Sequence, residues 1–163
     1  MRANGFVLST VSLRQGWPLL VLFVAVVVVI GLVVGLIAAP GDYVTHLKMP
    51  DLVLPPAVSS ALWFILAFVF AVTGWRMWML DSSSTEMRLW LAIQILSWWW
   101  SPIFFLIRSP VIALLVMIVM CALSLWFVIG SWHRDRISSL LFIPIFVYLA
   151  YVAAMNGAIV ALN

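Results

Sequence analysis

Five long apolar stretches without a charged side chain constrain this chain more than any other feature of its sequence. They lie in the intervals 14–42, 51–76, 88–108, 108–133 and 136–163, each bounded by ionisable residues or by the chain end. Each stretch can form an α-helix that crosses the hydrocarbon core of a membrane, which takes about 20 residues. Hydrophobic residues make up 67% of the chain and charged residues only 8%, too few charges to cover the surface of a soluble domain. We therefore expect an all-α integral membrane protein, with a single domain over residues 1–163.

The same composition argues against several other classes of protein. The Val, Leu, Ile and Trp runs do not alternate with polar residues, as the strands of a membrane β-barrel do. The first stretch is longer than the apolar core of a secretory signal, so a cleaved leader is not expected. A single cysteine, Cys121, permits no intrachain disulfide and suggests no thiolate metal site. The net charge is only +3 and the basic residues stand singly near the ends of the stretches, so we expect no nucleic-acid partner.

Prolines and short polar turns set the expected limits of the helices. We expect helices over about residues 17–39, 56–80, 87–107, 109–132 and 138–161. The segment 40–55 is the only long connection, and long loops in compact domains are often lids or binding loops. We therefore expect a lid-like loop there, with a passive linker as the alternative. The tight turn at residues 133–136 predicts that the last two helices are antiparallel neighbours.

The basic residues also predict an orientation in the membrane. The N-terminal segment and the second and fourth loops hold six Lys or Arg residues, whereas the first and third loops hold two. Cytoplasmic loops of membrane proteins carry an excess of Lys and Arg. We therefore expect a cytoplasmic N-terminus.

Uncharged polar residues inside the stretches are the first candidates for a site. Gln94, Ser97 and Ser101 follow i, i+3, i+7 spacing and share one helix face, and Asn156 lies deep in the last stretch. An unpaired polar group in lipid costs several kcal/mol, so these side chains should face inward. A structural polar clasp and a contact with a ligand both remain open.

Ionisable side chains point to no catalytic or metal centre. No helix interior holds one, which argues against a proton-coupled pump. The two histidines, His46 and His133, fall in loops on opposite sides of the expected bundle. We therefore expect no metal site and no cofactor.

Small residues and tryptophans indicate how the helices pack. Gly31 and Gly35 form a Gly-x-x-x-Gly pair, and Ala154 and Gly157 belong to small-residue ladders in the last stretch. Such spacings allow close approach of another helix. In the run 98–100, three tryptophans point about 100° apart, so at least one of them should face lipid or a neighbouring helix. Pro102 removes the hydrogen bond to the carbonyl of Trp98 and permits a local bend.

Four sequence blocks in the same order resemble the TspO/translocator-protein family, the tryptophan-rich sensory proteins of the peripheral benzodiazepine receptor type. They are Gly31-x-x-x-Gly35 with Ala39-Pro40-Gly41, then Pro50, Pro55 and Trp63, then Trp100-Ser101-Pro102-Ile103-Phe104-Phe105, and last Pro144, Tyr148, Tyr151 and Asn156. The third block is the most specific. The chain departs from the family pattern at Ala57, Ala61, Ala67, Ile93, Ser97 and Tyr148, which marks it as a divergent member.

The resemblance implies a fold and a ligand site. It implies a five-transmembrane-helix bundle of TspO type, often a homodimer, with a pocket roofed by the first loop. Positions carried over from the family place five residues in that pocket: Trp63, Ser97, Tyr148, Val152 and Met155. The last three follow i, i+4, i+7 spacing and share a helix face.

The favoured hypothesis is an integral membrane receptor or binding protein for hydrophobic planar ligands such as porphyrins. Its role would be in sensing, stress response or transport, and its partners a porphyrin-like or other hydrophobic small molecule and membrane lipid. Two other classes remain open. One is a light-dependent porphyrin-degrading enzyme, which is less favoured because Ala57 and Tyr148 stand where the family has tryptophan. The other is a structural partner subunit of a membrane complex.

Overall fold

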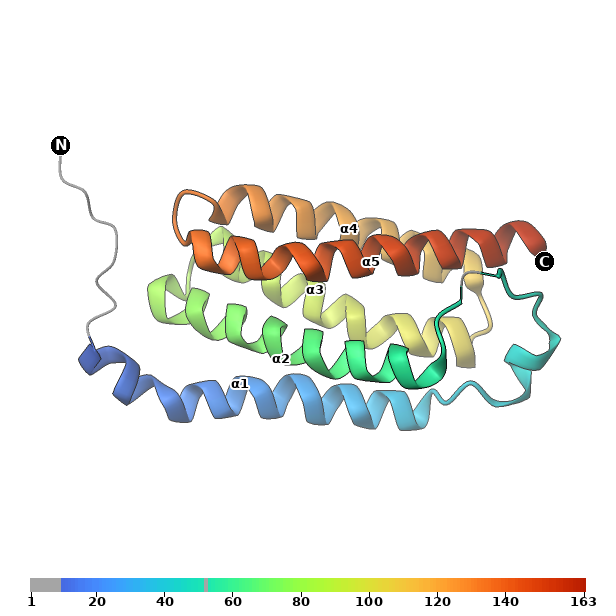
Figure 1. The fold of residues 1–163 in the computed structure, drawn as a ribbon, viewed down its shortest axis with the longest axis horizontal. Helices are drawn as coiled ribbons and strands as arrows, with labels where there is room; N and C mark the ends of the chain where they lie inside the picture. The colour runs from blue at the N-terminus through green and yellow to red at the C-terminus, as the bar shows by residue number, and fades with distance from the viewer. Residues whose placement is uncertain (1–9, 52) are drawn as a thin grey trace.

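The computed structural model describes residues 10–51 and 53–163, and in this part of the chain five long α-helices lie side by side (Figure 1). They are α1 (Thr10–Ile37), α2 (Pro56–Asp81), α3 (Thr85–Ser101), α4 (Pro110–Ser131) and α5 (Arg136–Leu162). Four of them, α1, α2, α4 and α5, are each long and apolar enough to cross a membrane, and α3 forms a span of this kind together with the next five residues, over Thr85–Leu106. The prediction of an all-α membrane protein with five spanning helices is confirmed.

The last two helices are neighbours, as the tight turn between them predicts, and α1 lies at the edge of the bundle. The tight loop before α5 makes α4 and α5 close neighbours, α3 packs on α4, and α1 packs chiefly on α2. Only 6% of the residues in an apolar 18-residue stretch of α1 are buried inside the bundle, compared with 22–28% in the corresponding stretches of the other four spans. Large side chains such as Trp17 and Leu36 are exposed on α1. A helix that is apolar all round and unburied in the bundle belongs in lipid, so the chain is an integral membrane protein.

A layer of aromatic rings fixes the centre of the bundle. Trp90 of α3 stacks on Phe70 of α2 with ring centroids 4.8 Å apart, and its indole N–H donates to the Phe70 carbonyl at 2.8 Å. Phe142 of α5 contacts both Phe70 and Phe127, at centroid distances of 5.5 and 4.1 Å. Gly74 permits this layer, because a Cβ there would overlap the Trp90 indole.

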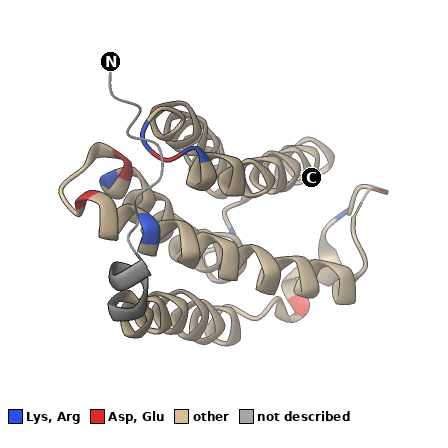
Figure 2. Ribbon diagram, turned by 60° about the vertical axis from the view of Figure 1, so that its left-hand side comes forward, with Lys and Arg blue, Asp and Glu red and all other residues tan. Residues whose placement is uncertain are grey.

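In the part of the chain that Figure 2 colours, Lys, Arg, Asp and Glu lie near the helix ends and in the loops, and none lies in the middle of the bundle. Arg76 makes a two-pronged ion pair with Asp135, at 2.9 Å from Nε and 2.8 Å from Nη2. Asp135 also accepts hydrogen bonds from the Ser138 hydroxyl at 2.6 Å and from the Ile137 N–H at 3.2 Å. Burial would raise the pKa of Asp135, but the hydrogen bonds from Arg76 and Ser138 and the charge of Arg76 outweigh it and hold that pKa below its usual value.

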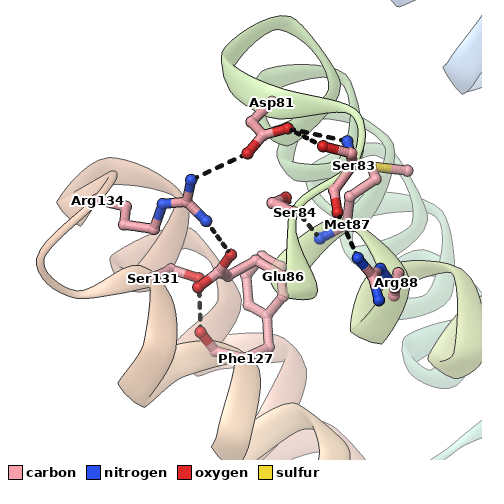
Figure 3. A network of polar contacts seen from close by, with 9 residues as sticks. All are labelled: Asp81, Ser83, Ser84, Glu86, Met87, Arg88, Phe127, Ser131 and Arg134. Atoms are coloured by element: carbon pink, nitrogen blue, oxygen red, sulfur yellow. Dashed lines mark hydrogen bonds and ion pairs between the residues drawn. The ribbon is translucent and has the colours of Figure 1, made fainter.

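A second ion-pair network joins the loops at the same end. Figure 3 shows Arg134, from the turn between α4 and α5, between the carboxylates of Asp81, the last residue of α2, and Glu86, in the first turn of α3. Its guanidinium contacts Glu86 at 2.6 Å and Asp81 at 3.1 Å. The hydrogen bonds to Glu86 and Asp81 raise the pKa of Arg134. The Ser84 hydroxyl accepts from the Met87 N–H at 3.1 Å, which is the N-cap that begins α3 two residues before the predicted start.

At the opposite end, the third helical span changes its hydrogen-bonding pattern at Pro102, where the sequence predicts a local bend. Residues Pro102–Leu106 form a single π-helical turn, η2, in which the Ile107 N–H donates to the Pro102 carbonyl at 3.0 Å. Proline has no N–H, so the regular bond to the carbonyl four residues earlier cannot form there. The wider turn follows the proline directly.

The first loop folds back onto the helix ends beside η2. It contains a short 3-10 helix, η1 (Gly41–His46). The Lys48 backbone exchanges two hydrogen bonds with the Asn163 side chain, at 2.9 and 3.2 Å, and the Leu54 N–H donates to the Tyr151 hydroxyl at 3.2 Å. The Tyr43 ring lies edge-on to Phe104 at 6.2 Å. These contacts hold the described part of the loop against the C-terminal end of α5 and the η2 turn.

Candidate ligand cavity

A cavity of about 550 Å³ lies between α1, α2 and α3, with α4 and α5 behind it. Its walls are mainly apolar, and none of its lining residues is Asp, Glu, Lys, Arg or His. This volume falls in the range of small-molecule sites, about 300–1,000 Å³, which are typically apolar with a few placed polar groups.

The wall between α1 and α2 depends on one glycine. The Trp63 indole of α2 lies over Gly31 of α1, so that a Cβ at residue 31 would come within 2.6 Å of Trp63 Cζ2. Gly35 also lines the cavity, but a Cβ there would meet no described atom within 4 Å. The Trp63 indole therefore packs directly against α1 at Gly31, whereas the position one turn further along α1 is open.

A tyrosine pair on α5 connects the cavity to the first loop. Tyr148 lines the cavity, and its ring lies 6.2 Å from that of Tyr151. The Tyr151 hydroxyl in turn accepts the hydrogen bond from the Leu54 N–H. The loop backbone thus contacts the helix that carries Tyr148.

A stripe of polar side chains on α3 faces the cavity. Gln94, Ser97 and Ser101 all line it, as their shared helix face predicts. The Gln94 side-chain N–H donates to the Ser97 hydroxyl at 3.1 Å, and that hydroxyl donates to the Gln94 backbone carbonyl at 2.7 Å. Three further buried polar atoms of the lining residues have no partner among the described residues: Gln94 Oε1, Trp98 Nε1 and Trp100 Nε1. The cavity therefore combines apolar walls with unpaired hydrogen-bonding groups from α3.

The comparison with known proteins agrees with this architecture. The sequence profile of the TspO/MBR family matches residues 23–162. The chain belongs to the TspO/MBR family. It is also similar to Protein CrtK of Rhodobacter capsulatus, with 25% identity over 138 residues that cover 79% of this chain and 83% of that protein. TspO/MBR membership makes this chain a membrane protein of a binding and sensory family.

Most positions expected from the TspO resemblance lie at the cavity. Trp63, Ser97, Tyr148 and Val152 line it, whereas Met155 does not. On α5 the lining residues end at Val152, so Met155 lies on the expected face but beyond the cavity. The role of these residues in ligand binding stays a prediction.

The remaining predicted residues lie at varied distances from the cavity. Asn156 is buried, but its amide atoms have no partner among the described residues and it does not line the cavity. A Cβ at Gly157 would lie 3.9 Å from Leu114 of α4, and Ala154 is exposed. No described residue of the loop 40–55 lines the cavity, so the roof implied by the TspO resemblance is not seen. Its role as a lid stays a prediction.

Several lining residues were not predicted, and the sequence held a signal for one of them. Trp98 lies one turn after Gln94 and lines the cavity, as does Trp100, whereas Trp99 is 59% exposed. The expectation that the three rings cannot all face one pocket is therefore confirmed. The i, i+4 relation to Gln94 would have singled out Trp98. Ser59, Ser60, Met117 and Met120 also line the cavity, and no sequence pattern distinguishes them from other membrane-helix residues.

Potential metal ligands are scattered. Within residues 10–51 and 53–163, no group of three or more His, Cys, Asp or Glu side chains could hold a metal ion.

Proposed function

We propose that this chain is a membrane receptor or binding protein for a hydrophobic planar ligand such as a porphyrin. Its role would be in sensing, stress response or transport. TspO/MBR membership supports the general class, and the cavity supports the kind of ligand.

One observation carries the proposal: the 550 Å³ cavity is mainly apolar, has no charged residue among its described lining residues and presents flat rings from three helices, α2, α3 and α5. Trp63 of α2 and Tyr148 of α5 both line it. Offset stacking of aromatic rings contributes about 0.5–1.5 kcal/mol per pair beyond burial. A flat apolar ligand is the class of molecule that such walls favour.

Replacement of the two rings tests the proposal. We expect Tyr148→Ala and Trp63→Ala each to raise the Kd for protoporphyrin about 3- to 10-fold, which corresponds to the loss of one stacking contact. The Kd is measured by quenching of tryptophan fluorescence and by the shift of the porphyrin absorbance band in nanodiscs. Trp99→Ala is the matched control, because its side chain is 59% exposed on the same helix as Trp98 and should leave the Kd unchanged. An unaltered Kd in both cavity variants would count against the site.

Light-dependent breakdown of a bound porphyrin is a second candidate function. Three tryptophans, Trp63, Trp98 and Trp100, line the cavity, so a bound porphyrin would lie close to indole rings. The purified protein is incubated with protoporphyrin in light and in darkness. A new absorbing product that forms only in light and only with protein supports the enzyme, and its absence supports a binding protein.

We propose further that the N-terminus is cytoplasmic and that the chain can form a homodimer. The distribution of Lys and Arg, six against two, supports the orientation. A reporter fused after Asn163 should then be active on the exoplasmic side. Mass measurement in nanodiscs tests the homodimer.

A further inference from the structure

Gln94 is a buried amide with a free acceptor at the cavity. Its side chain is only 5% exposed and lines the cavity from α3. Its Oε1 atom has no hydrogen-bond partner among the described residues. Buried polar atoms in proteins are nearly always paired, so an unpaired one needs an explanation.

Ser97 fixes which end of the Gln94 amide faces the ligand. The Ser97 hydroxyl has one proton, and it is donated to the Gln94 backbone carbonyl at 2.7 Å. Its oxygen can then only accept, and the group that donates to it is Gln94 Nε2, at 3.1 Å. The amide cannot flip without placing two acceptors against each other. The free group is therefore the carbonyl oxygen, which requires a donor.

The next turn of α3 offers the complementary group. Trp98 stands four residues after Gln94, on the same helix face, and also lines the cavity. Its indole N–H is buried without a partner among the described residues. The stripe thus presents an acceptor and a donor in neighbouring turns, inside walls that carry no charge.

We infer that Gln94 is a specificity residue that selects neutral planar ligands with an N–H or O–H donor beside a carbonyl oxygen, such as a lactam. The ligand donor pairs with Gln94 Oε1, and the ligand carbonyl accepts from the Trp98 indole. Ser97 is a positioning residue, since it orients the amide. This inference rests on the proposed function, because it names the chemistry of a ligand for the same cavity.

A pair of ligands that differ in a single donor tests the inference. Phenanthridinone is a flat, neutral lactam, and its N-methyl derivative keeps the carbonyl but lacks the N–H. A buried acceptor left unpaired weakens binding roughly 5- to 100-fold, so the wild-type protein should bind the N–H lactam at least about 5-fold more tightly. Each Kd is measured by tryptophan quenching in nanodiscs and corrected for partition of the compound into empty nanodiscs.

Two variants assign the preference to Gln94. Gln94→Met keeps the length of the side chain without an acceptor and should bring the ratio of the two Kd values close to one. Ser97→Ala frees the amide to rotate and should lower the ratio. The control is Ser124→Ala, which removes another buried polar atom that has no described partner but does not line the cavity, and it should keep the wild-type ratio.

The outcomes separate this inference from the function on which it rests. Equal binding of both lactams by the wild-type protein, or a preference that survives in Gln94→Met, overturns the role of Gln94 and leaves the ligand cavity standing. If neither lactam nor protoporphyrin binds, the proposed function fails and this inference fails with it. Should Gln94→Met not fold, the wild-type ratio of the two lactams still decides.

Discussion

The two glycines of the Gly-x-x-x-Gly pair, Gly31 and Gly35, test how α1 packs on α2, because only Gly31 lies against a side chain of α2, that of Trp63. A Cβ at Gly31 would lie 2.6 Å from Trp63 Cζ2 and 3.1 Å from Cη2, whereas a Cβ at Gly35 would meet nothing within 4 Å. Carbon atoms that are not bonded normally stay 3.5–4.0 Å apart. In Gly31→Ala, the Trp63 indole or α1 itself must therefore retreat by about 1 Å.

The magnitude follows from a comparison of the two variants. Alanine is favoured over glycine inside a helix by about 1 kcal/mol, and this gain is the same at both positions. Overpacking costs about 1–3 kcal/mol and applies only at Gly31. The propensity term cancels in the comparison, so Gly31→Ala should be about 1–3 kcal/mol less stable than Gly35→Ala. For a chain of this size that difference is about 3–10 °C in Tm.

Thermal unfolding in one detergent, followed by tryptophan fluorescence, provides the assay. We expect Gly35→Ala to melt at or slightly above the wild-type Tm and Gly31→Ala to melt below Gly35→Ala. Gly31→Ala should also raise the Kd for protoporphyrin, because the displaced Trp63 ring forms part of the cavity wall.

Equal destabilisation by the two substitutions would refute this reasoning. It would mean that Gly35 also packs against another helix. A helix of a second copy of the chain would then be the expected partner for the face of α1 that carries Gly31 and Gly35. A loss of dimer in Gly35→Ala at unchanged monomer Tm would point to the same conclusion.

Three further predictions concern other parts of the bundle. Gly74→Ala should lower the stability by about 2 kcal/mol or more, because the new methyl group overlaps the buried Trp90 ring; the measurement is the Tm in detergent. Asp135→Asn should destabilise the protein by about 2–4 kcal/mol, since it leaves the mostly buried Arg76 without its counter-charge. Because the folded-state pKa of Asp135 is lowered, its contribution to the free energy of unfolding is complete above the usual Asp pKa of 3.8 and is lost as the pH falls further. The difference in Tm between wild type and Asp135→Asn should therefore become smaller on acidification. A difference that stays constant would contradict the ion pair. Tyr151→Phe removes the acceptor of the Leu54 N–H and should speed protease cleavage within residues 40–55 without a change in Tm of more than a few degrees.

The sequence predicted the spanning helices well because charge and length are read directly from it. A charge in the hydrocarbon core is costly, so the ionisable residues mark the ends of the spans. The start of α3 was placed two residues late because the Ser84 N-cap was not recognised, although Ser84 and the nearby Glu86 are typical of a helix start. The π-turn at Pro102 was not predicted. A missing N–H permits a kink, a break or a wider turn, and the packing of the surrounding helices determines which of these forms.

The cavity was predicted less completely, because helical periodicity predicts which residues share a helix face but not which residues of a neighbouring helix pack against that face. Gly31 and Gly35 share a face, yet only Gly31 meets the Trp63 ring. Tyr148 and Met155 also share a face, yet the cavity ends between them. Such differences depend on where a partner helix lies along the axis, and no pattern within one helix contains that information.

The two ends of the bundle differ in how firmly they hold α1 in place. At the charged end, the ion pairs of Arg76 and Arg134 join α2, the start of α3 and the turn before α5, and the Trp75 indole anchors α1 by donating to the Gly16 carbonyl at 2.9 Å. At the cavity end, Trp63 of α2 packs on Gly31 of α1, and a Cβ added at Gly35 would meet nothing within 4 Å. Apolar contacts of this kind are individually weak and have no directional bonds to restore them. A displacement forced at Gly31 should therefore be taken up by α1 at the cavity end, while the ion-paired end keeps its geometry. If the proposed ligand binds in the cavity, we therefore expect it to displace α1 at this end and not at the ion-paired end.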